Sequence, residues 1–191
     1  MSPVTRVYLA RHGETAFNTD GRLRGLSDPP LNDVGRAEIA ALAAELAPFK
    51  PTLVLCSPLQ RAVATAEAIG AAAGAPVRVE QRLNDRDYGP QTGRPRTEVE
   101  QEYGSIDAAP GVESAEAVAK RAKRAFFELV DELGPGPLVM VSHDAFNQAL
   151  IRELDPTLGK VHQDTACWDQ LSLVDGVWRV DSYNNKAGRT Q

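Results

Sequence analysis

Residues 8–18 read YLARHGETAFN, an apolar run that ends abruptly in arginine, histidine and glycine. Short apolar runs alternate along the chain with segments of helical periodicity, and this alternation is typical of an α/β protein with a largely parallel sheet. The runs that we expect to form strands lie at 7–10, 52–56, 77–79 and 138–142. We therefore predict a three-layer α/β/α sandwich with a mostly parallel central sheet.

Four segments carry apolar residues at helical spacing. We expect the first to be capped by Asn32 and the third to follow Ser114. The second is expected to begin at Ser57, with Pro58 in the first helical position, and the fourth to follow VSHD at 141–144.

Two further stretches complete the outline of the predicted fold. Residues 170–183, QLSLVDGVWRVDSY, place Asp-Gly between two alternating runs, which predicts a β-hairpin and hence an antiparallel edge of the sheet. Residues 82–112 show no clear periodicity. Long ordered loops in compact domains usually carry function, so we expect this stretch to contribute to the site.

Length and composition favour one soluble domain over residues 1–191. The apolar fraction of 42% and the charged fraction of 25% are typical of a soluble globular protein. The sequence has no apolar run long enough to cross a membrane, and its first residues do not resemble a secretory signal. We therefore expect a cytoplasmic protein whose cysteines, Cys56 and Cys167, are structural thiols. The net charge of −5 argues against nucleic-acid binding, and nothing predicts the oligomeric state.

Three of the apolar runs end in polar residues of catalytic type, within LARHGE, CSPLQR and VSHD. The carboxyl ends of parallel strands form the ligand crevice of an open sheet, so we expect His12 and His143 to meet there. A neutral imidazole nitrogen of His12 can attack phosphorus while Arg11 holds the phosphoryl oxygens. Gly13 would let the backbone approach that group closely.

Six stretches then carry a resemblance to a known family. LARHGETAFN, GLSDPPLNDVGRAE, SPLQRAVATAEAI, RLNDRDYG, PGVESAEAVAKR and VSHDAFNQAL resemble, in order, the successive blocks of the histidine phosphatase superfamily, also called phosphoglycerate mutase-like. The blocks spread over residues 7 to about 152, most of the chain.

The resemblance implies roles for individual residues. It makes His12 the phospho-accepting histidine, with Arg11, Arg61 and His143 as further ligands of the phosphoryl group and Asn18 in contact with it. We expect Arg61 to lie in the first turn of its helix and His143 to be a cation that stabilises the transition state.

We also expect Arg24 and Gly25 to be among the substrate-binding residues. Arg24 belongs to a wider set of basic residues that are candidates for the mouth of the pocket. The other members of this set are Arg22, Arg86, Arg94 and Arg96.

The proton donor is left open between two carboxylates. Asp85 falls where the family usually has a glutamate that acts as general acid and base, whereas Asp144 matches the His-Asp pair of the acid phosphatase and phytase branch. We favour Asp85, because Asp144 directly follows His143 at the start of a helix, where an aspartate is commonly an N-cap.

Together these features predict a metal-independent phosphatase that hydrolyses small phosphate monoesters through a phosphohistidine intermediate. No cofactor and no metal are implied, because the arginines and His143 supply positive charge. One alternative is a phosphoglycerate mutase, although the paired arginines of mutases are missing between 97 and 113. The other alternative is a non-catalytic module that binds a phosphorylated ligand. The identity of the substrate is not predicted.

Overall fold

The structure is a computed structural model, and it describes residues 5–189. Its strands are β1 (Thr5–Arg11), β2 (Leu53–Cys56), β3 (Val77–Val79), β4 (Pro137–Ser142), β5 (Trp168–Val174) and β6 (Val177–Asn185). Its α-helices are α1 (Ala16–Thr19), α2 (Asp33–Leu46), α3 (Gln60–Ala73), α4 (Arg96–Tyr103), α5 (Ala115–Leu133) and α6 (Asp144–Leu154). Short 3₁₀ turns are η1 (Ala47–Phe49), η2 (Gln81–Leu83), η3 (Gly89–Gln91) and η4 (Pro156–Leu158).

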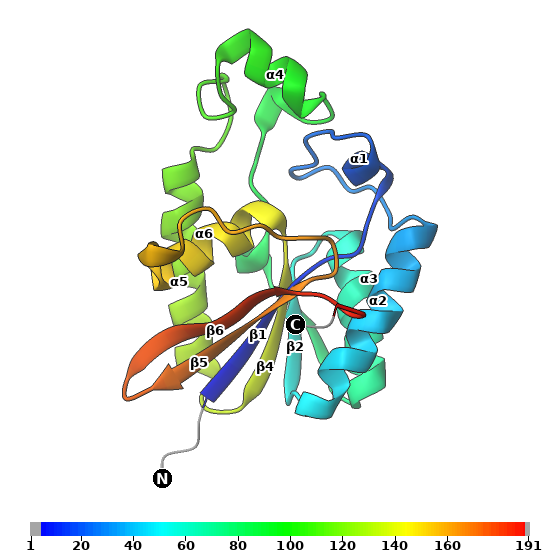
Figure 1. Cartoon of the computed structure of the whole chain (residues 1–191), viewed down its shortest axis with the longest axis vertical. Helices are drawn as coiled ribbons and strands as arrows, with labels where there is room; N and C mark the ends of the chain where they lie inside the picture. Colours follow the sequence, from blue (N-terminus) through cyan, green and yellow to red (C-terminus); the bar gives the residue numbers. More distant parts are fainter. Residues whose placement is uncertain (1–4, 190–191) are drawn as a thin grey trace.

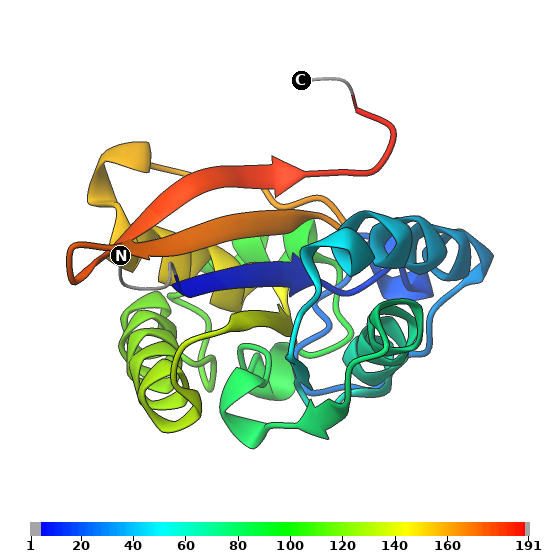
Figure 2. The same cartoon turned by 90° about the horizontal axis from the view of Figure 1, so that it is seen from below.

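The strands form one six-stranded sheet in the order β3-β2-β4-β1-β5-β6. The first four strands in this order are mutually parallel, whereas β5 and β6 are antiparallel to their neighbours. Helices α2 and α3 cover one face and α5 and α6 the other (Figure 1), and Figure 2 shows the same layers from below. The predicted sandwich, including its antiparallel edge, is confirmed.

Alternate residues of the central strands fill two separate cores. Tyr8 and Ala10 of β1 belong to the cluster formed with α2 and α3. Val7 and Leu9, which point to the opposite face, belong to the cluster formed with α5 and α6. Because both faces are covered, the strand ends are fixed by apolar packing from two sides.

Two of the predicted helix starts are confirmed and one is wrong. Asn32 Oδ1 accepts a hydrogen bond from the Gly35 amide at 2.8 Å, and Ser114 Oγ accepts one from the Ala117 amide at 3.1 Å. The second helix was expected to begin at Ser57, but α3 begins at Gln60. The Ser57 side chain instead contacts His143, the residue that follows β4, as described below.

The predicted hairpin is confirmed as β5 and β6. Its turn residues, Asp175 and Gly176, have φ of 51° and 76°, as a type I′ turn requires. This turn matches the right-handed twist of the strands that it joins.

Residues 16–31 and 84–112 form a cap beyond the carboxyl ends of the strands, where Figure 1 shows α1 and α4. The cap has a small apolar cluster of its own, made of Leu23, Tyr88, Val99, Ile106 and Ala109. The sequence did not predict α4, because Val99 is the one buried residue of this helix and no apolar stripe marks it.

Two simpler features follow from the described residues, 5–189. No helix among them has the length and apolar character needed to cross a bilayer, and no group of three or more His, Cys, Asp or Glu side chains is placed to hold a metal ion. Cys56 and Cys167 are buried free thiols.

Candidate active site

The two histidines predicted to meet do lie together. β1 and β4 are parallel neighbours in which Arg11 pairs with Ser142, so the residues that follow each strand emerge side by side. The rings of His12 and His143 have centroids 5.1 Å apart and an interplanar angle of 54°. Both side chains are fully buried.

The backbone fixes the tautomer of His12. Its Nδ1 lies 2.7 Å from the carbonyl oxygen of Gly13, and because a carbonyl can only accept, Nδ1 carries the proton. Nε2 therefore holds a lone pair, and this buried atom has no hydrogen-bond partner among the described residues. Burial, followed by the electrostatic influence of His143 and Arg61, holds the pKa of His12 well below its usual value. His12 is thus a neutral imidazole suited to nucleophilic attack.

His143 is held by Ser57, a residue whose role the sequence did not reveal. The Ser57 hydroxyl lies 2.6 Å from His143 Nε2 and accepts a hydrogen bond from the Leu59 amide at 3.3 Å. With that lone pair engaged, Ser57 can donate its proton to Nε2, which leaves Nδ1 of His143 as an N–H donor. Burial and the nearby arginines, Arg61 first, hold the pKa of His143 well below its usual value. The ring is therefore neutral in the protein without a bound anion, and the expectation that His143 is a cation in the transition state stays a prediction.

Arg61 joins the cap to the site. It is fully buried as the second residue of α3, as predicted. Its Nη1 donates to the Ser27 carbonyl at 2.7 Å, and Nη2 donates to the Gly25 carbonyl at 2.9 Å and to Asp85 Oδ2 at 3.1 Å. Gly25 thus contributes a backbone oxygen that orients Arg61.

The two candidate proton donors have different surroundings. Asp85, 5% exposed, lies between Arg61 and His143, with Oδ2 3.6 Å from His143 Nδ1. Asp144 is half-buried, and its Oδ1 accepts a hydrogen bond from Gln148 Nε2 at 2.6 Å. The expectation that Asp144 caps its helix is wrong: His143 occupies the N-cap position and Asp144 is the first helical residue, so its side chain bonds along the helix instead.

A polar cavity of about 340 Å³ lies at this edge of the sheet. The predicted residues that line it are Arg11, Asn18, Arg22, Arg24, Arg96 and Asp144. Arg86 and Arg94 serve the cap instead: Arg86 Nε donates to the Glu113 carbonyl at 2.8 Å, and Arg94 Nη2 donates to Glu102 Oε2 at 2.6 Å. A second cavity of about 420 Å³ reaches Asp85 from the side of α5.

Gly13 and Asn18 have structural contacts that the sequence did not predict. A Cβ on Gly13 would lie 2.7 Å from the Gly35 carbonyl oxygen, so glycine is required where β1 meets α2. Asn18 Oδ1 accepts hydrogen bonds from the amide and hydroxyl of Thr15, at 2.9 and 2.8 Å. Asn18 nevertheless lines the polar cavity, as Arg11 does.

After burial, the electrostatic influence of His143, Arg61, Arg11 and Arg24 lowers the pKa of His12, so these residues lie near it. Among the described residues, the buried nitrogens with no hydrogen-bond partner include Arg11 Nε, Arg24 Nε, Arg61 Nε, His12 Nε2 and His143 Nδ1. Buried donors are normally satisfied, and a set dominated by cationic donors suits a multivalent anion such as phosphate.

Comparisons with known proteins agree with this chemistry. A family model described as histidine phosphatase superfamily (branch 1) matches residues 7–186. The chain is 31% identical over 224 residues to a glucosyl-3-phosphoglycerate phosphatase of Mycolicibacterium vanbaalenii, with 96% of each chain covered. It is 29% identical over 184 residues to the uncharacterized phosphatase PhoE of Bacillus subtilis, with 95% of each covered.

A solved structure gives the same picture. The native mycobacterial glucosyl-3-phosphoglycerate phosphatase superimposes with a TM-score of 0.84 at 30% identity, covering 96% of this chain and 100% of that one. The complex of this phosphatase with VO3 superimposes with a TM-score of 0.86 at 31% identity, covering 95% of this chain and 100% of that one.

Proposed function

The chain belongs to the histidine phosphatase superfamily and, like the named phosphatases that it resembles, is a hydrolase of phosphate esters; we propose that it passes the phosphoryl group of small monoesters through His12. The observation that carries this proposal is the His12 imidazole, with Nδ1 tied to a carbonyl and Nε2 left as a buried lone pair. Residues 1–191 would act as one catalytic domain.

In the first step the Nε2 lone pair of His12 attacks phosphorus in line with the ester oxygen. The N–P bond forms as the P–O ester bond breaks, and Asp85, in its protonated form, gives its proton to the leaving oxygen. The position of Asp85 between Arg61 and His143 supports this assignment over Asp144.

In the second step water attacks the phosphohistidine. The Asp85 carboxylate takes the proton of the water, the N–P bond breaks, and inorganic phosphate leaves a neutral His12. Asp85 is thereby protonated again for the next ester, so the cycle closes without loss or gain of a proton on the protein.

The arginines would stabilise the phosphoryl oxygens. Arg11 and Arg24 line the cavity, and Arg61 is buried beside Asp85. Charged donors that are already in place need little reorganisation as negative charge moves in the transition state. The neutral His143 would donate from Nδ1, and a bound dianion would favour its protonation.

We also propose a specific substrate to test and a cellular location for the enzyme. Glucosyl-3-phosphoglycerate is the first compound to test, because the phosphatase named for it matches nearly the whole chain. We place the enzyme in the cytoplasm, with the free thiols of Cys56 and Cys167 as support, since reducing compartments keep cysteines from forming disulfides.

The decisive experiment follows the phosphate. Wild-type protein mixed rapidly with ³²P-labelled substrate should carry acid-labile label, and His12→Ala should lose both label and phosphate release. His162→Ala, which alters the exposed histidine that lines the polar cavity, should keep the label if His12 is the nucleophile. Label that persists in His12→Ala would place the nucleophile elsewhere.

Two further measurements test the reaction type. Phosphate release should persist in excess EDTA, and its loss on chelation, with recovery on adding a divalent ion, would contradict the mechanism. With 3-phosphoglycerate and a bisphosphate primer, isomer interconversion faster than phosphate release would show a mutase instead.

A further inference from the structure

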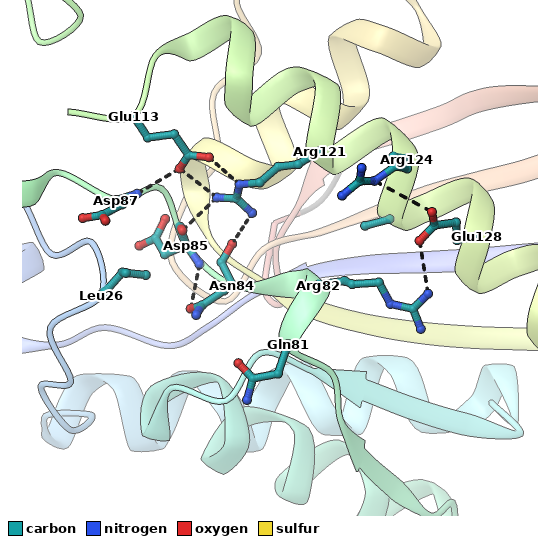
Figure 3. A pocket seen from close by; sticks show the side chains of 11 residues that line it. Leu26, Gln81, Arg82, Asn84, Asp85, Asp87, Glu113, Arg121, Arg124 and Glu128 are labelled. Atoms are coloured by element: carbon teal, nitrogen blue, oxygen red, sulfur yellow. Dashed lines mark hydrogen bonds and ion pairs between the residues drawn. The ribbon is translucent and has the colours of Figure 1, made fainter. Parts of the chain in front are cut away.

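Glu113 and Arg121, both in the stretch PGVESAEAVAKR, form an ion pair beside the site that the proposed reaction does not use. Glu113 precedes α5 and Arg121 lies within it. Arg121 Nε donates to Glu113 Oε1 at 2.6 Å, and Nη2 donates to Oε2 at 3.1 Å, which makes the pair bidentate (Figure 3). Such pairs are geometrically specific as well as strong.

The same guanidinium grips the backbone that carries Asp85. Arg121 Nη1 donates to the Asn84 carbonyl at 2.9 Å, and Nη2 donates to the Asp85 carbonyl at 2.8 Å. Both contacts appear in Figure 3, where Arg121 reaches down from α5. Because these are main-chain contacts, they fix the segment whatever its side chains are.

Glu113 holds the next two residues of that segment. Its Oε2 accepts a hydrogen bond from the Asp87 amide at 3.0 Å, and its carbonyl accepts one from Arg86 Nε at 2.8 Å. Each residue from 84 to 87 is therefore tied to Glu113 or Arg121. Although burial raises it, the pKa of Glu113 is held below its usual value by the hydrogen bonds from Arg121 and the Asp87 amide, so the carboxylate stays charged.

Asp85 needs this support because regular structure does not supply it. The residue lies between η2 and η3, outside every helix and strand. Its Oδ2 must nevertheless stay 3.1 Å from Arg61 Nη2 and 3.6 Å from His143 Nδ1. A misplacement of about 1 Å at a reacting group can cost on the order of 100-fold in rate.

We propose that Glu113 and Arg121 are positioning residues that hold the 84–87 segment so that Asp85 can transfer its proton to the leaving oxygen. The inference rests on the proposed function, since it takes Asp85 as the proton donor. A purely structural link between the cap and α5 would instead affect folding or all substrates alike.

The test compares two substrates with different leaving groups. For Arg121→Gln and Glu113→Gln we expect kcat/KM for an alkyl phosphate such as glycerol 3-phosphate to fall by roughly 10- to 100-fold. For p-nitrophenyl phosphate, whose leaving group needs little protonation, we expect a change within about 3-fold. Equal losses on both substrates would overturn the inference.

Arg82 provides a matched control. It joins η2 to α5 through Glu128 at 3.3 Å and Glu132 at 2.8 Å, a few residues before Asp85, and forms no hydrogen bond or ion pair with Asp85. Arg82→Gln should lower the midpoint of thermal unfolding while leaving the ratio of the two kcat/KM values unchanged. If Arg82→Gln shifts this ratio as much as Arg121→Gln does, general loosening of the segment explains the effect and the inference fails.

A double-mutant cycle with Asp85→Asn separates this inference from the proposed function. If Arg121 acts through Asp85, adding Arg121→Gln to Asp85→Asn should change the alkyl rate by less than about 3-fold. If the losses of the two single variants multiply in the double variant, Arg121 does not act through Asp85, and the positioning role is overturned while Asp85 remains the donor. If Asp85→Asn alone lowers the rates on both substrates equally, Asp85 is not the proton donor, and the positioning role of Glu113 and Arg121 fails with it. If Arg121→Gln does not fold, the same cycle is measured with Glu113→Gln, which keeps the shape of the side chain.

Discussion

The floor of the site and its cap are held together by different forces. We define the floor as His12, Arg61 and His143, which are fully buried. His12 directly follows β1, Arg61 lies in α3 and His143 directly follows β4. Both faces of that sheet are covered by large apolar clusters. The cap has one small cluster and relies on ion pairs, such as that between Arg94 and Glu102 at 2.6 Å.

This difference suggests separate tasks: the floor holds the phosphoryl group, and the cap contacts the rest of the substrate. A rigid, apolar-backed floor can hold cationic donors at fixed positions, which phosphoryl transfer requires of every ester. A cap held by polar contacts can open locally without unfolding the sheet. We therefore expect changes in the floor to abolish the chemistry, whereas changes in the cap should alter which leaving groups are accepted.

The largest effect should come from removing charge in the floor. Arg61→Ala deletes a buried guanidinium and its ion pair with Asp85, so kcat/KM should fall by about 10³- to 10⁴-fold and affinity for vanadate should fall with it. Isothermal titration with vanadate and steady-state kinetics measure the two losses. Arg124→Ala, at an exposed arginine of α5, is the control. Unchanged vanadate affinity in Arg61→Ala would remove this residue from the anion site.

The second effect concerns the carboxylate contributed by the cap. Asp85→Asn should lose about 10²- to 10³-fold on glycerol 3-phosphate and far less on p-nitrophenyl phosphate, because only the alkyl leaving group needs the proton. Asp144→Asn should show no such selectivity, since its oxygen is engaged by Gln148. The reverse result would assign the donor to Asp144 and move acid catalysis from the cap to α6.

A third pair of variants compares the two cores directly. Ile69→Ala, in the core beneath α3, should lower the free energy of unfolding by about 3 kcal/mol without changing kcat at 25 °C. Val99→Ala, in the cap cluster, should cost only about 1 kcal/mol globally but speed hydrogen exchange in residues 84–112 and lower kcat. Urea unfolding and exchange mass spectrometry measure these effects. Equal global losses would mean that floor and cap unfold as one unit.

The last prediction concerns the buried polar groups that support Arg11 beside the floor. Asp169 is fully buried and accepts a hydrogen bond from Gln163 Nε2 at 2.8 Å, and the Gln163 carbonyl in turn accepts one from Arg11. Burial raises the pKa of Asp169 from its usual 3.8 to about 7, although bonds from Gln163 and the Asn184 amide oppose the rise.

The sign of the pH dependence follows from that shift. The folded state binds the Asp169 proton more tightly than the unfolded state, so this contribution to stability is complete below about pH 4 and disappears as pH rises through about 7. From pH 5 to 8 the loss should be on the order of 2 kcal/mol. Urea unfolding of wild type and Asp169→Asn at several pH values isolates this term, and parallel curves for the two proteins would contradict it.

The sequence by itself determined much of the sheet and of the floor. The strands that end near Arg-His and Ser-His could be predicted, because an apolar run and the polar residues that follow it are local features of the sequence. Arg61 was placed correctly in the first turn of α3 for the same reason. The Asp-Gly turn also specified its hairpin locally, through residues that tolerate positive φ.

Only the tertiary structure decided the contacts between distant segments. Ser57 seemed a helix start until β2 and β4 brought it to His143, 86 residues away. The hydrogen bond from Arg121 to the Asp85 carbonyl likewise joins residues 36 apart, and burial lowers the pKa of His143 so that the ring is neutral without a bound anion. Hydrogen bonds and desolvation depend on which groups meet in three dimensions, and local periodicity carries no information about that.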